Sequence, residues 1–425
     1  MNRYEFVQHL QGLDVVAATE ELASSIKCPV RKRIDAIVNY HIEHNPLYRS
    51  KLVNNPFGSF EDLPIMRKMD FQKPLKELIS DEYKIRDLYV HNTSGSSGNP
   101  FFYAKNKESH AIVHSILQRL YSEHGIAMCD KQARFYGIPS SGTSRYIELL
   151  KDRLLNRTRF PIFDLSDSAL NNFLKKFKNG EYIYIYGYTS AISIFAKYLR
   201  TKNIILKKVC PTLKACIVTS EVCTKEDRQI IEDYIGVKVI NEYGCSEAGI
   251  IAFEDIKGVW RLIEDDCYFE IVDDKGNVLP EGSEGRLLIT NLSNKAMPFI
   301  RYEVGDIAII THDEQGRILK TLSGRVSDLI KLPSGKIAGG LTFYYISRTI
   351  MEKGVSIKEF IVRQTKLDCF EFDIVSNEPI NSEIAKILQT NMDKYLEPGL
   401  NLKINIVDQI NRPKSGKIKH FYSEI

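Results

Sequence analysis

From Leu88 onward, short apolar runs alternate with longer amphipathic segments along the sequence. The alternation is regular over the segments 182–186, 190–200, 213–219, 225–234 and 237–240. Apolar runs of strand length separated by segments of helical length are typical of a largely parallel sheet with crossover helices. The sequence therefore predicts an α/β fold, with parallel sheets in a large N-terminal domain.

The segments on either side of this region have different patterns. Helical signals at 6–13, 32–43 and 70–79 are joined by proline-bearing turns, which predicts a helical lead-in. Between 267 and 311, short strand signals alternate with turn residues. That pattern predicts a smaller antiparallel or barrel-like portion.

The last part of the chain has the pattern of a separate small domain. After residue 325, helix and strand signals follow one another over about one hundred residues, enough for a small α+β domain. We therefore expect a helical lead-in of the N-terminal domain over 1–85, an N-terminal core over 86–326 and a C-terminal domain over 327–425.

Composition and charge limit the classes of protein that fit. The chain has 425 residues, 43% of them hydrophobic, and its 58 basic and 54 acidic residues give a net charge of +4, which does not predict a nucleic-acid partner. No apolar run reaches the roughly eighteen residues of a membrane span, and the first residues lack a signal-peptide pattern. The eight cysteines have no CxxC spacing, so we expect neither a disulfide framework nor a zinc ribbon. We expect a cytoplasmic protein without membrane insertion.

A loop rich in glycine and hydroxyl groups follows the apolar run 88–90. Its candidate phosphate-binding residues are Thr93, Ser94, Gly95, Ser96, Ser97 and Gly98. Glycine lets backbone N–H groups approach phosphate oxygens closely, and the hydroxyl groups add further donors. A flexible surface loop has a similar composition, so both interpretations stay open. The loop lacks the Gly-Lys-Ser ending of a P-loop, and no GxGxxG fingerprint follows a strand.

A second candidate cluster, residues 241–249, directly follows the short apolar strand predicted at 237–240. Ligands bind at such strand ends in α/β sheets. Tyr243 could lie against a purine, Ser246 could donate to a phosphate, and the Glu247 carboxylate could hold Mg²⁺ beside it. The alternative is that Glu247 is a solvent-exposed loop carboxylate.

A third candidate is Asp306, which follows a tight glycine turn in the segment 299–306. In this position its carboxylate could accept hydrogen bonds from both hydroxyls of a ribose. Taken alone, Asp306 would be an ordinary turn residue.

The order of these segments resembles that of the adenylate-forming superfamily, which includes acyl-CoA ligases, peptide-synthetase adenylation domains and luciferases. Residues 93–100 resemble its phosphate loop, 243–247 its Tyr-Gly-x-Thr-Glu block and 301–306 its Tyr-x-Thr-Gly-Asp block. Further on, 324–331 resemble its hinge motif and 412–418 its C-terminal lysine motif. The resemblance covers most of the chain, and several blocks in the same order are far more specific than any one of them.

Within the superfamily, the sequence resembles the phenylacetate-CoA ligase branch and its CapK-like relatives. Residues 297–302 resemble the Pro-x-Ile-Arg-Tyr segment of that branch, and 185–190 resemble its Gly-Tyr-Pro-Ser segment. Phe101 stands where many members of the superfamily carry lysine. Further departures, each in place of a threonine, are Ser97, Ser246 and Val304.

The resemblance implies an ATP-dependent, AMP-forming ligase that converts a carboxylic acid to an acyl-adenylate, with ATP and Mg²⁺ as cofactors and CoA as a further candidate. It implies catalytic roles for Lys417 and Glu247, with Glu247 as the metal ligand. Asp328 matches the hinge position about which the C-terminal domain rotates. The implied ATP- or AMP-binding residues are Thr93, Ser94, Gly95, Ser96, Ser97, Gly98, Ser220, Glu221, Asn241, Glu242, Tyr243, Gly244, Ser246, Asp306 and Arg325. The acyl-pocket candidates are Tyr136, Gly137 and Tyr188, although an ordinary core aromatic is the better interpretation of Tyr136.

Three functions are compatible with this resemblance. In the first, the acyl group passes to an amine, a sugar or a carrier protein, as in surface-polysaccharide biosynthesis, and the short turn at 332–336 favours this hypothesis. In the second, the acyl group passes to CoA. The third is an inactive protein that senses ATP or AMP, but retention of Lys417, Glu247 and Asp306 argues against it. The expected partners are a small carboxylic acid and an acceptor of unknown identity, and a homodimer is compatible with the sequence.

Overall fold

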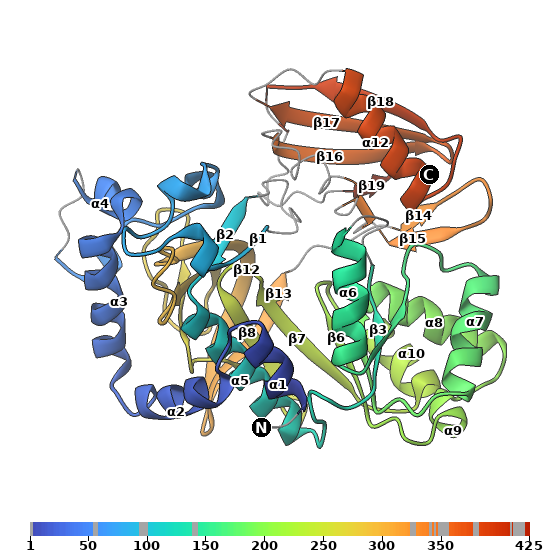
Figure 1. The fold of residues 1–425 in the computed structure, drawn as a ribbon, viewed down its shortest axis with the longest axis horizontal. Helices are drawn as coiled ribbons and strands as arrows, with labels where there is room; N and C mark the ends of the chain where they lie inside the picture. Colours follow the sequence, from blue (N-terminus) through green and yellow to red (C-terminus); the bar gives the residue numbers. More distant parts are fainter. Residues whose placement is uncertain are drawn as a thin grey trace. The chain divides into compact units, whose positions relative to one another are not determined.

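The computed structural model (Figure 1) describes residues 3–53, 58–92, 101–137, 143–323, 329–339, 342–343, 346, 357–376, 382–408, 410 and 421–425. The chain packs into two compact units. Unit 1 contains residues 1–93, 101–128 and 242–324, and unit 2 contains residues 94–100, 129–241 and 325–425. Each unit is therefore built from segments that are far apart in the sequence. In the part of the chain that the structure describes, no helix combines the length and apolar character needed to cross a membrane.

Unit 1 begins with the helices α1 (Arg3–Leu10), α2 (Val15–Ser25), α3 (Val30–His44) and α4 (Pro46–Leu52). Side chains fix two of the helix starts: Asp14 accepts a hydrogen bond from the N–H of Ala17, and Asn45 accepts one from the N–H of Tyr48, both at 3.0 Å. Pro46 stands at the start of α4, where a backbone N–H has no intrahelical partner to lose. The helices predicted at 6–13 and 32–43 correspond to α1 and α3.

The helix predicted over 70–79 is wrong. The chain there forms two short 3-10 turns, η2 (Lys68–Phe71) and η3 (Leu75–Glu77), and similar turns flank them at η1 (Phe60–Asp62) and η4 (Ile85–Asp87). Pro74 lies between η2 and η3. Because proline lacks a backbone N–H and its ring clashes with the preceding turn, a continuous helix cannot run through this position without a break.

The β-structure of unit 1 is antiparallel. Strands β1 (Tyr89–Asn92) and β2 (Phe102–Lys105) pair with each other, and helix α5 (Lys107–Glu123) follows them. The larger sheet has the order β10-β11-β12-β13-β9-β8-β7 within this unit. Its strands are β7 (Val239–Cys245, of which 242–245 belong to unit 1), β8 (Gly249–Glu254), β9 (Trp260–Leu262), β10 (Cys267–Val272), β11 (Glu284–Asn291), β12 (Tyr302–Asp313) and β13 (Gly316–Ser323). Antiparallel pairing of β10, β11 and β12 confirms the change of pattern that the sequence shows after residue 267.

Unit 2 contains the parallel sheet. Its strands pair in the order β6-β5-β3-β4, and each of these pairs is parallel, as the alternating pattern predicted. The strands are β3 (Gln132–Phe135), β4 (Arg157–Phe160), β5 (Tyr184–Tyr188) and β6 (Ala215–Thr219). The helices between and after them are α6 (Thr143–Leu154), α7 (Asp167–Lys178), α8 (Thr189–Thr201), α9 (Leu206–Val209) and α10 (Lys225–Ile235). Apolar side chains of strands and helices share one core, with Phe135 and Ile185 packed together with Phe173 and Leu199.

One close contact in this sheet requires glycine. Gly187 on β5 lies beside Phe135 on β3, and a Cβ atom at Gly187 would stand 2.4 Å from the Phe135 carbonyl oxygen. Any other residue would push these two strands apart. The glycine therefore keeps β3 and β5 in register at the end of the sheet where both strands finish.

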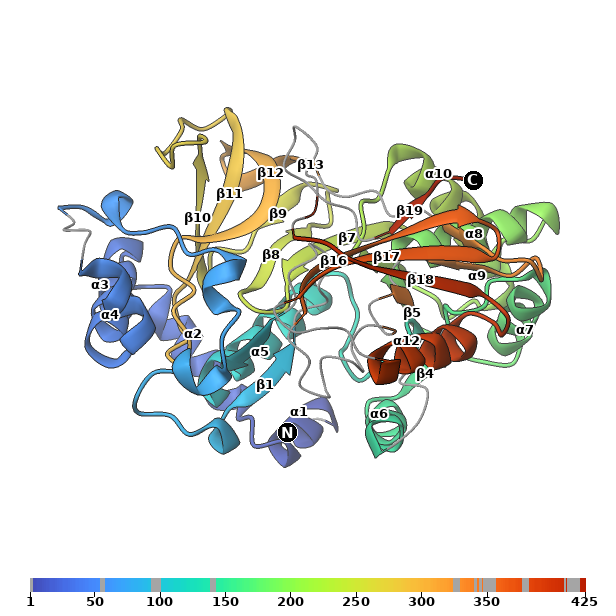
Figure 2. The ribbon, with the colours of Figure 1, turned by 90° about the horizontal axis from the view of Figure 1, so that it is seen from above.

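The C-terminal part of unit 2 is a small α+β structure, seen from above in Figure 2. Its four-stranded sheet has the order β18-β17-β16-β19, with one antiparallel and two parallel pairs. Phe360 and Phe372 of the sheet share a core with Leu388 and Met392 of the helix. The elements are β14 (Leu329–Lys331), β15 (Ile337–Gly339), β16 (Ile357–Lys366), β17 (Cys369–Ser376), α12 (Ser382–Tyr395), β18 (Asn401–Ile406) and β19 (Phe421–Ser423). The predicted fold class is thereby confirmed, whereas the predicted domain boundary at 326 and 327 lies outside the described residues and stays a prediction.

Candidate active site

Glu247 and Tyr302 form a buried pair in unit 1. Glu247 lies in the turn between β7 and β8 and is only 5% exposed, so it is not a solvent-exposed loop carboxylate. The hydroxyl of Tyr302, the first residue of β12, donates a hydrogen bond of 2.8 Å to Glu247 Oε1. The Tyr302 ring is held by edge-on contacts with Phe71 and Phe299. A carboxylate that is held in this way can present its remaining lone pairs to a cation at a fixed position.

Tyr243 and Asp306 form a second pair in the same unit. The Tyr243 hydroxyl donates a hydrogen bond of 2.8 Å to Asp306 Oδ2, and the Tyr243 ring makes an edge contact with Trp260. The pair joins β7 to β12. Glu247 follows shortly after the end of β7, and Tyr302 is the first residue of β12. The structure therefore brings together two of the blocks that the sequence singled out, residues 243–247 and 301–306.

Arg301 anchors the second of these blocks. Its side chain is 2% exposed and pairs with the equally buried Glu270 of β10, with N–O distances of 3.0 to 3.2 Å. It also donates to the backbone carbonyls of Glu61 and Leu63 in the N-terminal segment. Arg301 adopts a left-handed backbone conformation, with φ of 44°. Burial raises the pKa of Glu270, and the Arg301 guanidinium opposes that rise. We therefore infer that Arg301 holds in place the chain segment that contains its neighbour Tyr302.

Tyr302 and Arg301 received no role from the sequence, although both stand inside a block that resembled the superfamily pattern. Sequence spacing gave no signal that Tyr302 would meet Glu247, since 55 residues separate them. Arg301 gave no signal either, because a buried arginine is rare and its partners lie far away in the chain.

In unit 2, Ser220 and Glu221 follow the end of β6. Ser220 is exposed and has a φ of 70°, an unusual conformation for a residue other than glycine. The Glu221 carboxylate accepts hydrogen bonds from Ser190, at 2.7 Å from its backbone N–H and 3.0 Å from its hydroxyl. Burial raises the pKa of Glu221, and the two Ser190 hydrogen bonds oppose the rise. Glu221 therefore holds the start of helix α8, and a contact with adenine stays a prediction for both residues.

The acyl-pocket candidates lie among aromatic side chains at the carboxyl ends of β3 and β5. The rings of Tyr136 and Tyr188 have centroids 4.4 Å apart, and Tyr136 stacks on Tyr186 at 5.6 Å. The Arg134 guanidinium lies 4.4 Å from the Tyr136 ring centroid, in cation–π geometry. The Tyr136 hydroxyl is 3.5 Å from Ser220 Oγ, which connects this cluster to the end of β6. Carboxyl ends of parallel strands are the usual ligand-binding edge of such a sheet, but Tyr188 is buried in the core of unit 2 and Tyr136 packs against that core, so a pocket role for both stays a prediction.

The other predicted residues at 241–246 differ in burial and in hydrogen bonding. Glu242 is buried and accepts a hydrogen bond of 3.4 Å from the Tyr121 hydroxyl, on the face of β7 opposite to Tyr243. Asn241 is half-buried, whereas Gly244 and Ser246 are exposed. Their roles in nucleotide binding stay predictions. The remaining predicted site residues lie outside the described residues: Thr93, Ser94, Gly95, Ser96, Ser97, Gly98, Arg325, Asp328 and Lys417.

The chemistry of Glu247 fits a magnesium ion that accompanies a nucleotide. Within the described ranges, no group of three or more His, Cys, Asp or Glu side chains has metal-binding geometry. Mg²⁺ bound together with ATP needs no such cage, because one or two carboxylates and the phosphate oxygens are its usual ligands. A single buried carboxylate with one oxygen fixed by Tyr302 meets that requirement.

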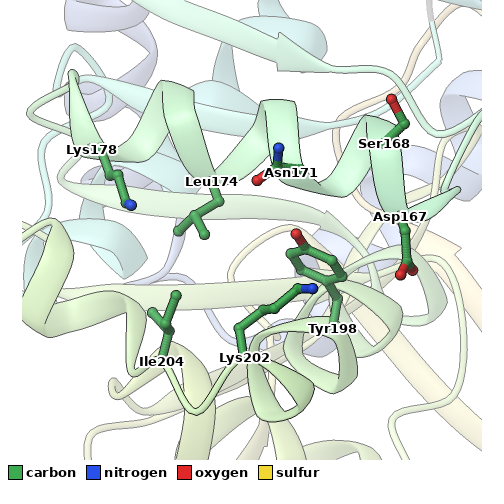
Figure 3. Close-up of a pocket in the computed structure, with 8 residues that line it drawn as sticks. All are labelled: Asp167, Ser168, Asn171, Leu174, Lys178, Tyr198, Lys202 and Ile204. Carbon is green, nitrogen blue, oxygen red and sulfur yellow. The ribbon is translucent and has the colours of Figure 1, made fainter.

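A cavity of about 540 Å³ lies elsewhere in unit 2, between α7 and α8 (Figure 3). Its lining is mixed, with Leu174 and Ile204 beside polar and charged side chains of both signs. None of the predicted site residues lines it. We therefore assign it no part in the candidate active site.

The chain is similar to known proteins over most of its length. Residues 337–424 match the family model described as the CapK C-terminal domain. The protein CapK of Staphylococcus aureus is 22% identical over 405 residues, which cover 91% of this chain and 86% of CapK. A phenylacetate-coenzyme A ligase of Thermus thermophilus is 26% identical over 397 residues, 84% of this chain and 82% of that protein.

The same class of fold is found among solved structures. The open conformation of 2-hydroxyisobutyryl-CoA ligase, crystallised with 2-HIB-AMP and CoA, aligns with a TM-score of 0.56 and 18% identity, covering 93% of this chain and 92% of that one. The relatives of this chain are thus named CapK and phenylacetate-coenzyme A ligase, and its fold is that of an acyl-CoA ligase that binds an acyl-adenylate.

Proposed function

We propose that this AMP-forming ligase uses ATP and Mg²⁺ to activate a small carboxylic acid as an acyl-adenylate, and then transfers the acyl group to an amine, a sugar or a carrier protein. The single observation that supports the proposal best is the pairing of two motif blocks in unit 1, through Tyr243 with Asp306 and Tyr302 with Glu247. These are the side chains expected to meet the nucleoside and the metal–phosphate part of one ATP molecule.

The chemistry explains why such groups are needed. A carboxylate is a poor electrophile because its negative charge repels nucleophiles, whereas a mixed anhydride with AMP provides a good leaving group. Mg²⁺ supplies positive charge where negative charge accumulates on the phosphates during adenylation. In this proposal Glu247 holds the ion, and Tyr302 keeps the Glu247 carboxylate in one orientation. Lys417 is the proposed second cation at the α-phosphate.

Separate residues are proposed to contact the nucleoside, in unit 1, and the acid, in unit 2. Asp306 is proposed to accept hydrogen bonds from the ribose hydroxyls, with Tyr243 fixing one of its two oxygens. The acid is proposed to lie against Tyr136 and Tyr188, where an aromatic surface and the nearby Arg134 suit an apolar acid with a negative end.

The proposal and its main alternative differ in the molecule that accepts the acyl group. An acceptor other than CoA, in surface-polysaccharide biosynthesis, is proposed from the resemblance of the sequence to CapK-like proteins, and the similarity to CapK and the match of residues 337–424 to the CapK C-terminal model support that resemblance. Similarity to a phenylacetate-coenzyme A ligase over 82% of its length supports CoA as the acceptor instead. The two functions share the adenylation step and differ only in the second step.

Pyrophosphate release across a panel of aromatic, fatty and amino acids, with and without CoA, tests the proposal. We expect release that depends on one class of acid and on Mg²⁺, without formation of a CoA thioester. Formation of the thioester would establish the alternative. If no acid produces pyrophosphate while ATP still binds, the protein is a nucleotide sensor and the proposed function is wrong. Lys417→Ala is the matched variant, expected to abolish release and to leave ATP binding within about threefold of wild type.

A further inference from the structure

Helix α6 packs onto unit 2 through its polar face. Glu148 and Asp152, one helical turn apart, both form ion pairs with the guanidinium of Arg159 on β4. Asp152 is buried and Glu148 is half-buried. Surface helices normally bury an apolar face and expose a charged one, so α6 has the reverse arrangement.

The outward face of α6 is correspondingly apolar. Its large side chains are exposed by 74% at Tyr146, 52% at Ile147, 44% at Leu149 and 57% at Leu150. Isolated exposed apolar residues are common on proteins, but several on one short helix form a patch of the kind that marks an interaction site. We call these four residues the α6 patch.

The charges around the α6 patch are basic. Arg145, Lys151 and Arg153 are the basic residues of the helix, and its only acidic residues are the two that bind Arg159. Burial alone would raise the pKa of Glu148, but the charges of Arg159 and Lys151 outweigh burial and hold its pKa below the usual value. A second copy of the same helix would bring like charges together, whereas an acidic partner would complement them.

The same arginine connects the α6 patch to the predicted acyl pocket. Arg159 donates a hydrogen bond to the backbone carbonyl of Gly137, the residue after Tyr136. The inner face of α6 and the end of β3 are therefore held by one guanidinium, which is itself only 13% exposed. A protein bound on the outer face of α6 would lie next to the end of the sheet where the acid is proposed to bind.

We propose that the α6 patch docks an acidic amphipathic helix of a small acyl carrier protein, which receives the acyl group. The inference rests on the proposed function, because it names the acceptor of that reaction. The carrier thiol attacks the carbonyl carbon of the acyl-adenylate, a carbon–sulfur bond forms, the bond from the carbonyl carbon to the phosphate oxygen breaks, and AMP leaves with the bonding electrons. The thiol proton is released to solvent, so the step is balanced without a further reactant.

The test measures binding and adenylation separately. A fluorescently labelled acyl carrier protein bearing its phosphopantetheine thiol is the probe, and its anisotropy reports binding to the full-length protein. Ile147→Glu and Leu150→Glu each place a negative charge in the apolar α6 patch. Ile256→Glu is the matched control, because Ile256 is 60% exposed and lies in unit 1, outside the patch.

We expect saturable binding that weakens at least tenfold in Ile147→Glu and Leu150→Glu and stays unchanged in Ile256→Glu. Binding should also weaken as salt is raised from about 0.1 M to about 0.5 M, because screening reduces attraction between opposite charges. Pyrophosphate release should be the same in Ile147→Glu, Leu150→Glu and Ile256→Glu. Substituting exposed positions should leave the thermal midpoint unchanged, which separates a docking defect from misfolding.

Two results would overturn the inference. One is carrier binding that is absent or equal in wild type and both patch variants. The other is a wild-type dimer, seen by sedimentation velocity, that Ile147→Glu converts to a monomer, since the patch would then bind a second copy. Failure of pyrophosphate release with every acid overturns the proposed function instead, and the binding measurement distinguishes the two failures.

Discussion

The Tyr302 hydroxyl donates a hydrogen bond of 2.8 Å to Glu247 Oε1, although the two residues are 55 positions apart in the chain. Both side chains are buried, and the tyrosine has no freedom to leave because aromatic rings pack against it. A hydrogen bond of this kind orients a metal ligand without contacting the metal. It links the core of unit 1 directly to the proposed magnesium site.

Replacing Tyr302 by phenylalanine removes the hydroxyl and keeps the ring. We expect the Mg²⁺ concentration needed for half-maximal pyrophosphate release to rise about tenfold to hundredfold, the usual effect of losing a group that orients a metal ligand. Tyr268→Phe, on β10 of the same unit, is the matched control. An unchanged Mg²⁺ dependence in Tyr302→Phe would mean that Tyr302 does not orient a ligand of the ion.

Substitutions of Tyr243 separate its ring from its hydroxyl. Tyr243→Phe should raise KM for ATP about threefold to tenfold, because Asp306 loses the donor that fixes one of its oxygens, a loss of about 1 kcal/mol. Tyr243→Ala should raise KM further, because the ring that is predicted to stack on adenine is also lost. Steady-state kinetics at saturating acid measure both effects. Equal KM values in the two variants would argue against stacking.

The buried pair of Arg301 and Glu270 governs stability. Arg301→Met leaves a buried carboxylate without its partner, and we expect about 3 to 5 kcal/mol of destabilisation. The double variant Arg301→Met with Glu270→Met should be less destabilised than Arg301→Met alone, since no charge is then left unpaired. Urea unfolding midpoints measure the difference, with Arg86→Ala, in an exposed pair with Asp87, as a control expected within about 1 kcal/mol of wild type. A double variant less stable than Arg301→Met would contradict this explanation.

Asp266 makes stability depend on pH. Burial raises the pKa of Asp266 from its ordinary value of 3.8 to about 6, while hydrogen bonds from Ser293 and Asn291 oppose the rise. Since the folded state binds the proton more tightly than the unfolded state, stability is lost as the pH rises from about 4 to above 6, by about 3 kcal/mol. Asp266→Asn has no such ionisation.

Thermal midpoints of wild type and Asp266→Asn, measured from pH 4 to pH 8, check this expectation. The midpoint of the variant relative to wild type should increase with pH and level off above pH 7. Asp274→Asn, at an exposed turn, controls for loss of a carboxylate. A difference between wild type and Asp266→Asn that does not change with pH would contradict the expected ionisation.

The sequence predicted the fold class because local patterns carry that information. Alternating apolar and amphipathic segments correspond to β5, α8, β6 and α10, where the periodicity of each segment matches the element that it forms. The helix predicted over 70–79 was wrong because Pro74 interrupts the backbone hydrogen bonds, although the apolar spacing around it is helical.

The candidate site was only partly predictable. Tyr243, Glu247 and Asp306 stood out because they match blocks of a known pattern, and the structure places them in one unit. The partners of such residues could not be predicted from the sequence. The contacts of Tyr302 with Glu247 and of Arg301 with Glu270 depend on strand pairing across the sheet. The inverted polarity of α6 was likewise unpredictable, because a helical pattern shows which side is apolar and does not show which side is covered.

Unit 1 is built from early and late segments of the chain, and this has a consequence for folding during translation. Its first helices come from the beginning of the chain, but the strands that complete its core come from residues 242–324, and Arg301 binds carbonyl groups at Glu61 and Leu63. During translation, the early helices must therefore wait for more than half of the polypeptide to emerge. The strands β3 to β6 of unit 2, by contrast, are contiguous enough to assemble while the ribosome is still extending the chain.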